Sequence, residues 1–136
     1  MQRGLDARRG PDGKIIGCAM RVHQTLGPGF LESVYHKSLA HESSKAGLKV
    51  ECHRAVQVIY NGVVVGDFIA DMLVADRVLV ENKAVQSLVQ AHEAQLVNYL
   101  ATTGIEIGLL LNFGASSLQV RRKYRTYRSK GQTVRE

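Results

Sequence analysis

Three charged residues in the middle of the chain, Asp71, Glu81 and Lys83, have types and spacing that could support metal-dependent chemistry. They fall in two expected strands that are joined by a short turn at Asp76. If the turn is centred on Asp76, Asp71 lies directly opposite Glu81 on the neighbouring strand. Lys83 shares the face of Glu81 because strand side chains alternate with a period of two. The sequence therefore predicts two carboxylates and one ammonium group on one face of a hairpin.

Two opposed carboxylates repel each other, so this arrangement favours a compensating cation. Mg²⁺ prefers oxygen ligands and is commonly held by one or two carboxylates together with water and substrate phosphate. Such an ion activates water and stabilises charge on a phosphate, and a nearby lysine can assist. The alternative is a solvent-facing strand face with salt bridges, which is common in proteins. The hairpin alone does not decide between the two.

A polar stripe on the next expected helix could border the same site. His92, Gln95 and Tyr99 are spaced at i, i+3 and i+7, opposite the apolar residues Leu96 and Leu100. A stripe of this kind could contact a phosphate or the lysine. By itself it is an ordinary pattern of a helix surface.

The elements that would position these residues follow from periodicity and turn signals. Asp12 is expected to cap a first helix that ends at Gly27, and Asn61-Gly62 predicts a tight hairpin turn. The order of elements is helix, helix, three strands, helix, two strands (ααβββαββ). This order predicts an α/β fold with a mixed central β-sheet flanked by helices. The later elements are expected at residues 30–47, 50–60, 63–74, 78–85, 87–104, 107–113 and 118–124.

Composition is that of one ordinary globular domain. The chain has 136 residues, of which 45% are hydrophobic and 22% charged. No apolar run reaches the roughly 18 residues that cross a bilayer, and no secretory signal is evident, so we expect a cytoplasmic protein. Two cysteines, Cys18 and Cys52, are too few for a disulfide framework or a zinc site. We expect Cys18 to be buried and Cys52 to be an ordinary strand residue.

Basic residues are concentrated toward the C-terminus. The formal net charge is +6, and Arg121, Arg122 and Lys123 begin a basic stretch interleaved with Tyr124 and Tyr127. This mixture suits phosphate contacts and base stacking. A solvated tail is the alternative for the last residues. We expect a disordered segment at 1–11, a domain at 12–127 and a basic tail at 128–136.

Taken together, these residues resemble a known pattern. Asp71, Glu81-Asn82-Lys83 and Gln95 to Tyr99 are similar to the D…ExK…QxxxY arrangement of PD-(D/E)XK nucleases, especially the branch of recombination-associated exonucleases. Upstream, Gly29, Glu32 and Tyr35 match the GxxExxY signature of a small bacterial family in that superfamily. The resemblance extends from about Ile15 to Arg122.

The resemblance implies a restriction-endonuclease-like core and a metal-dependent nuclease that acts on nucleic acid, with DNA the expected substrate. It implies that Glu32, Asp71 and Glu81 hold Mg²⁺ or Mn²⁺ and that Lys83 supports the nucleophile. The residues expected to contact substrate are Gln95, Tyr99, Arg121, Arg122 and Lys123.

The chain departs from the family pattern at three positions. Ala70 replaces the proline of the superfamily's name, and Ile69 stands where similar proteins often have an arginine. Asn82 occupies a usually apolar position and should face the core, where it needs a hydrogen-bond partner.

Two other roles stay open. The chain could be a non-catalytic nucleic-acid-binding module, or a protein-interaction module on the same fold. A homodimer would supply additional substrate-binding surface.

Overall fold

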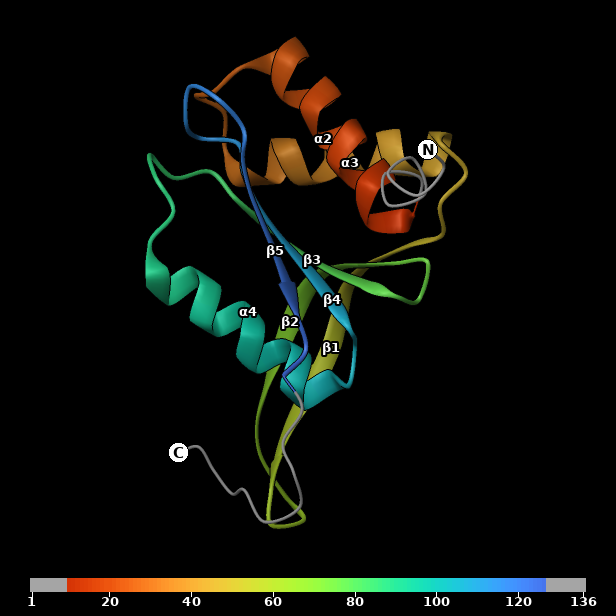
Figure 1. The fold of residues 1–136 in the computed structure, drawn as a ribbon, viewed down its shortest axis with the longest axis vertical. Coiled ribbons are helices and arrows are strands. Elements are labelled where there is room, and N and C mark those ends of the chain that lie inside the picture. The colour runs from red at the N-terminus through yellow and green to blue at the C-terminus, as the bar shows by residue number, and fades with distance from the viewer. Residues whose placement is uncertain (1–9, 127–136) are drawn as a thin grey trace, which may run out of the picture.

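A computed structural model describes residues 10–126 of the chain, which form a sheet with helices on both sides (Figure 1). The expected strands 50–60 and 63–74 have the predicted bounds, and the others differ by one or two residues at their ends. In chain order the elements are α2 (Pro11–Leu26), α3 (Glu32–Lys45), β1 (Val50–Tyr60), β2 (Val63–Val74), β3 (Val78–Lys83), α4 (Gln90–Thr103), β4 (Ile107–Asn112) and β5 (Gln119–Tyr124).

The sheet contains five strands in the order β1-β2-β3-β4-β5. Strands β1 to β3 form an antiparallel meander, because each connection is a short turn. The helix α4 connects β3 to β4, so these two strands are parallel, and β5 returns antiparallel to β4. The predicted α/β fold with a mixed central sheet is confirmed.

Two separate hydrophobic clusters lie on the two faces of the sheet. Helices α2 and α3 pack together and cover one face, and α4 covers the other (Figure 1). The α2–α3 cluster contains the fully buried Met72, Val74, Val78 and Val80, the apolar hairpin face that the sequence predicts for the core. The α4 cluster contains Ala70, Leu79, Leu96, Leu100 and Leu110.

Both hairpin turns use residues in the left-handed region. Asn61 and Gly62 have φ values of 52° and 77°, as the sequence predicts for a two-residue turn between Tyr60 and Val63. In the second turn Ala75 and Asp76 have φ values of 55° and 56°. This turn fixes the β2–β3 register and therefore the positions of the acids.

Helices α2 and α3 begin at other residues than the pattern predicts. Helix α2 starts at Pro11 with Gly10 as its N-cap, whereas Asp12 forms an ion pair with Arg122 at 2.9 Å. Proline suits a first helical position because the missing N–H has no partner there. Phe30, expected in the second helix, precedes α3 and is half exposed.

Helix α4 begins at Gln90, not near Ser87 as predicted. Side chains of neighbouring strands hold the preceding segment extended: the Val85 N–H donates to the Asn112 amide oxygen, and the Leu88 N–H donates to the Gln119 amide oxygen. Local capping signals cannot reveal these long-range bonds. The cap is instead His92, whose Nδ1 accepts from the Val89 N–H at 3.1 Å.

The terminal predictions lie largely outside the described residues. This holds for residues 1–9 of the expected N-terminal segment and for the whole expected tail at 128–136. Between residues 10 and 126, no helix has the length and apolar character needed to cross a membrane.

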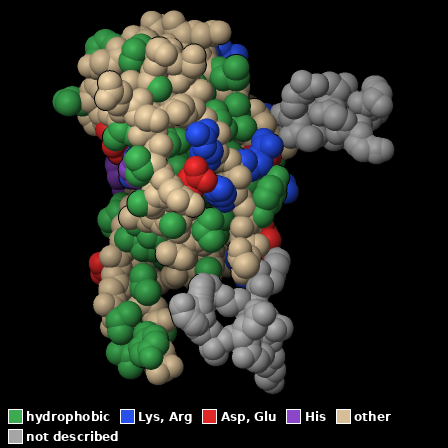
Figure 2. Space-filling model, turned by 60° about the vertical axis from the view of Figure 1, so that its left-hand side comes forward, with side chains coloured by type: hydrophobic (Ala, Val, Ile, Leu, Met, Phe, Trp, Pro, Cys, Tyr) green, Lys and Arg blue, Asp and Glu red, His purple; other side chains and the backbone are tan. Residues whose placement is uncertain are grey.

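The distal part of the β1–β2 hairpin projects beyond the helices (Figure 1). Exposed apolar side chains gather at its tip, at the lower end of the view in Figure 2. They include Ile59, Tyr60, Val63, Val64 and Val65, each at least half exposed.

Gly114 allows a close approach between the end of β4 and the segment that follows Lys83. A Cβ atom built at Gly114 would lie 2.4 Å from the Val85 carbonyl oxygen and 2.6 Å from the Ala84 carbonyl carbon. Both are backbone atoms, so no side-chain rotation can relieve the clash. Only glycine fits at this position without moving the chain that follows Lys83.

We expect Gly114→Ala to lower the free energy of unfolding by roughly 2 kcal/mol or more, because backbone must move to admit the methyl group. Chemical denaturation with urea measures the change. Gly17→Ala is the matched control: its Cβ would meet nothing within 4 Å in helix α2, so it should raise stability by about 0.5–1 kcal/mol. Equal effects of the two substitutions would contradict this assignment.

Candidate active site

The β2–β3 ladder opens where the two acids face each other. The strands pair at Met72–Val80, in the register that the sequence predicts. One residue further, the Asp71 N–H donates to Glu81 Oε2 at 3.2 Å, and the Asn82 N–H donates to Asp71 Oδ2 at 2.7 Å. Carboxylates therefore take the place of backbone carbonyls as acceptors. Each acid binds the backbone of the opposite strand.

Glu81 is a buried carboxyl group beside a second one. Only 8% of the residue is exposed. Burial, and then the charge of Asp71, raise its pKa from the ordinary value of 4.5 to about 8, while the hydrogen bond from the Asp71 amide and the charge of Lys83 oppose this rise. The strands thus hold two acids and a lysine close enough to influence one another.

Glu32 joins this group from another part of the chain. It is the first residue of α3, and its pKa is raised by partial burial and then by Asp71, whereas Lys83 lowers it. The start of α3 therefore faces the open end of the β2–β3 ladder. The structure brings together all four residues expected to be catalytic.

Tyr35 holds the start of α3 in this position. Its side chain is fully buried, and its ring stacks on Phe113 at a centroid distance of 4.9 Å. The hydroxyl donates to the Gly27 carbonyl and accepts from the Phe30 N–H at 3.1 Å. Gly29, with a φ of 115°, provides the turn. Gly29 and Tyr35 thus shape the backbone that presents Glu32.

Helix α4 contributes Tyr99 and Gln95, as expected. The Tyr99 ring stacks on Phe68 at 3.6 Å. Burial raises the pKa of Tyr99, with further contributions from Glu81 and Asp71, and a hydrogen bond with the Gln95 side chain opposes the shift. Tyr99 therefore lies within electrostatic reach of both acids. The third member of the expected stripe, His92, caps the helix instead.

The basic residues of β5 are engaged in ion pairs. Arg121 and Lys123 both bind Glu93 of α4, at 3.2 and 2.6 Å. Arg122 binds Asp12 on the opposite side of the sheet, because strand side chains alternate. The three basic residues among those expected to contact substrate therefore do not form one surface. Their role in substrate binding stays a prediction.

Asn82 is completely buried on the core side, as the sequence predicts. Its side-chain amide lies 3.4 Å from Nδ1 of His36 and 3.7 Å from the sulfur of Met72. His36, which is 8% exposed, also contacts the ring of His53 at a centroid distance of 4.7 Å. The sequence pattern indicates neither histidine. His53 reaches the site through an irregular backbone conformation in β1, and His36 reaches it through a contact between α3 and the distant Asn82.

The donor set fits a hard divalent cation. Glu32, Asp71 and Glu81 offer only carboxylate oxygens, the ligands that hard cations prefer. Burial, and then the charge of Asp71, raises the pKa of both glutamates, and a bound cation would oppose this rise as Lys83 does. Within residues 10–126 no three acidic, histidine or cysteine side chains are grouped as a ready metal site. Both strand carboxylates accept hydrogen bonds from backbone amides.

A cavity of about 330 Å³ lies against this group. It is lined by Glu32, Ser33, His36, Lys37, His53 and Asp71.

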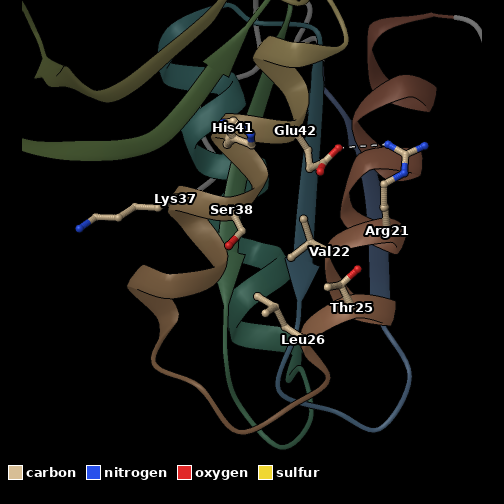
Figure 3. Close-up of a pocket in the computed structure, with 8 residues that line it drawn as sticks. All are labelled: Arg21, Val22, Thr25, Leu26, Lys37, Ser38, His41 and Glu42. Carbon is tan, nitrogen blue, oxygen red and sulfur yellow. Dashed lines mark hydrogen bonds and ion pairs between the residues drawn. The ribbon is translucent and has the colours of Figure 1, made fainter.

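A second cavity, of about 350 Å³, lies between α2 and α3 (Figure 3). It includes none of the three acids. Arg21 and Glu42, which line it, form an ion pair at 3.2 Å. Its remaining lining, Val22, Thr25, Leu26, Lys37, Ser38 and His41, offers no carboxylate, so its chemistry does not match the hairpin site.

The comparisons with known proteins identify the family. A sequence model of the PD-(D/E)XK nuclease superfamily matches residues 11–123, which is most of the chain. The chain belongs to this superfamily, and its mixed sheet with flanking helices is consistent with the restriction-endonuclease-like fold. No curated protein and no solved structure matches the chain.

We expect the metal-free protein to lose stability as the pH rises from about 5 to about 8. Folded protein retains a proton on Glu81 where the unfolded chain, with a pKa near 4.5, has lost it. The stabilising contribution is complete below pH 4.5 and is lost as pH rises through the folded pKa, with a slope of at most about 1.4 kcal/mol per pH unit. Urea denaturation in EDTA across this pH range measures the free energy of unfolding.

Glu81→Gln provides the control, because it removes the titrating group and keeps the shape. Its stability should depend less on pH over the same interval. Adding Mg²⁺ at pH 8 should stabilise the wild type more than the variant. An identical pH profile for the two proteins would refute the coupling.

Proposed function

We propose that this member of the PD-(D/E)XK superfamily is a metal-dependent nuclease that hydrolyses phosphodiester bonds, with DNA as its substrate. The observation that carries the proposal is the convergence of Glu32, Asp71, Glu81 and Lys83 at the opening of the β2–β3 ladder. The Gly29, Glu32 and Tyr35 positions further support assignment to the GxxExxY branch.

In the proposed mechanism Asp71, Glu81 and Glu32 hold Mg²⁺ or Mn²⁺. When bound, such an ion supplies an activated water and neutralises charge on the phosphate. The side-chain oxygens of these carboxylates would be its ligands. The charge of Asp71 adds to burial in raising the pKa of Glu81, and a bound cation would offset both effects.

Lys83 acts from the same strand as Glu81. Its ammonium group lies close enough to lower the pKa of both Glu32 and Glu81. We infer that it orients the attacking water or neutralises charge that develops on the phosphate. Gln95 and Tyr99 form the wall on the α4 side, where the stacked Phe68–Tyr99 pair holds the tyrosine in place.

The positive net charge of +6 supports an anionic polymer as substrate. We assign DNA from the family resemblance, and a homodimer would extend the binding surface of this small domain. Two rival roles, a non-catalytic nucleic-acid-binding module and a protein-interaction module, require neither metal nor the carboxylates.

We expect purified protein to cleave plasmid or oligonucleotide DNA with Mg²⁺ or Mn²⁺, and Lys83→Ala to lower the rate by roughly 100-fold or more. Gel electrophoresis of the products measures the rate. The matched control is Lys49→Ala, which removes one lysine from an exposed ion pair with Asp76 and should cleave like wild type. RNA substrates tested in parallel show whether the protein cleaves DNA or RNA.

Absence of metal-dependent cleavage above the Lys83→Ala background, over both DNA and RNA, would reject the catalytic role. Binding that is salt-sensitive but unchanged by Mg²⁺ and by Asp71→Asn would then favour the binding module.

A further inference from the structure

His53 has an unusual backbone conformation for its position. Among the described residues, four other than glycine have positive φ, and three of them, Asn61, Ala75 and Asp76, lie in hairpin turns. His53, with a φ of 56°, lies inside strand β1. A left-handed conformation is unfavourable for a residue with a side chain, although histidine tolerates it better than most. Something other than local preference therefore holds His53 in place.

The irregularity lies directly beside Asp71. The β1–β2 ladder pairs Cys52 with Met72 and Arg54 with Ala70, so His53 stands opposite Asp71, and this one pair is missing from the ladder. The kink turns the His53 ring onto His36 of α3. It thereby puts an imidazole at the edge of the proposed active site.

Three residues that carry hydrogen-bond donors line the cavity next to the acids. Lys37, Ser33 and His53 line it together with Glu32 and Asp71. Lys37 extends away from the cavity between α2 and α3, which it also borders (Figure 3). Lys37 and His53 are both exposed and therefore accessible to a ligand.

These donors are also available to bind a ligand. Within residues 10–126, no hydrogen bond or ion pair holds the Lys37 ammonium, the Ser33 hydroxyl or the ring nitrogens of His53. In addition, Nε2 of the buried His36 has no hydrogen-bond partner there. By contrast, the basic residues of β5 are bound to carboxylates. The cationic group best placed to meet a substrate near the acids, apart from Lys83, is therefore on α3.

We propose that Lys37, His53 and Ser33 form a phosphate-binding subsite that holds a backbone phosphate of the nucleic acid beside the acidic group. This inference rests on the proposed function and deepens it. The non-bridging oxygens of a phosphodiester accept from an ammonium, an imidazole N–H and a hydroxyl. The cavity volume of about 330 Å³ is at the lower end of the range for small-ligand pockets. Glu32 and Asp71 would repel the same phosphate, so a divalent cation should strengthen its binding.

Binding of a fluorescein-labelled single-stranded or duplex DNA, followed by fluorescence anisotropy in EDTA and again with Ca²⁺, tests the subsite. The integrity of the DNA is checked by gel afterwards. Lys37→Ala should weaken binding by about 10-fold and reduce the slope of log Kd against log salt by about 1. Lys45→Ala, which removes the same charge from the same helix, should change Kd less than about 2-fold, because Lys45 pairs with Glu42.

His53→Gly separates binding from folding. Glycine accepts a φ of 56° without strain, so the melting temperature should stay constant or rise by a few degrees while DNA binding weakens. If His53 served only to cover His36, the variant would lose stability and bind DNA like wild type. That result would overturn the role of His53.

The subsite is rejected if wild type binds DNA in neither buffer, or if Lys37→Ala and His53→Gly bind like wild type. Cleavage is measured separately with Lys83→Ala. A protein that binds DNA through Lys37 and His53 but cleaves nothing would retain the subsite and refute the nuclease proposal. A protein that cleaves normally after both substitutions would retain the nuclease and refute the subsite.

Discussion

The hydrogen bonds between two carboxylates and the backbone of the opposite strand organise this molecule. In a regular antiparallel pair, the carbonyls of β3 would accept from β2, and the side chains would stand clear of the ladder. Here Asp71 and Glu81 supply the acceptors themselves. The strands can part without leaving buried amides unpaired, and the opening makes room for groups from α3 and α4. The same bonds hold both acids close together, and the charge of Asp71 adds to burial in raising the pKa of Glu81.

The surrounding elements are placed by packing that never touches the acids. Tyr35 ties the loop before α3 and stacks on Phe113, which fixes where Glu32 begins its helix. On the other face, Gly108 permits a similar approach: a Cβ there would lie 2.9 Å from the Leu96 side chain of α4. Within the same motif, the buried Tyr35 thus shapes the site, whereas Glu32 faces it.

Much of this could be predicted from the sequence, because turn chemistry and strand alternation are local. The turn at Asp76 set the register, and the register put Asn82 in the core and Asp71 against Glu81. Features that depend on distant partners could not be predicted. The start of α4 depends on Asn112 and Gln119, and the ion pairs of β5 depend on Glu93 and Asp12. Nor does any local signal reveal the left-handed φ of His53, since its neighbours read as a continuous strand.

At the irregular position of His53 and Asp71, the side chains of β1 and β2 also change from one hydrophobic cluster to the other. Val50 and Met72 pack in the α2–α3 cluster, whereas Val56 and Ala70, an even number of residues away, pack in the α4 cluster. One pair of strands therefore belongs to both hydrophobic layers. Loss of packing in one hydrophobic cluster would displace strands that also form the other cluster. The domain should therefore unfold as a single cooperative unit. A one-residue slip of this hairpin would misplace apolar side chains on both sides at once, which makes the register costly to lose.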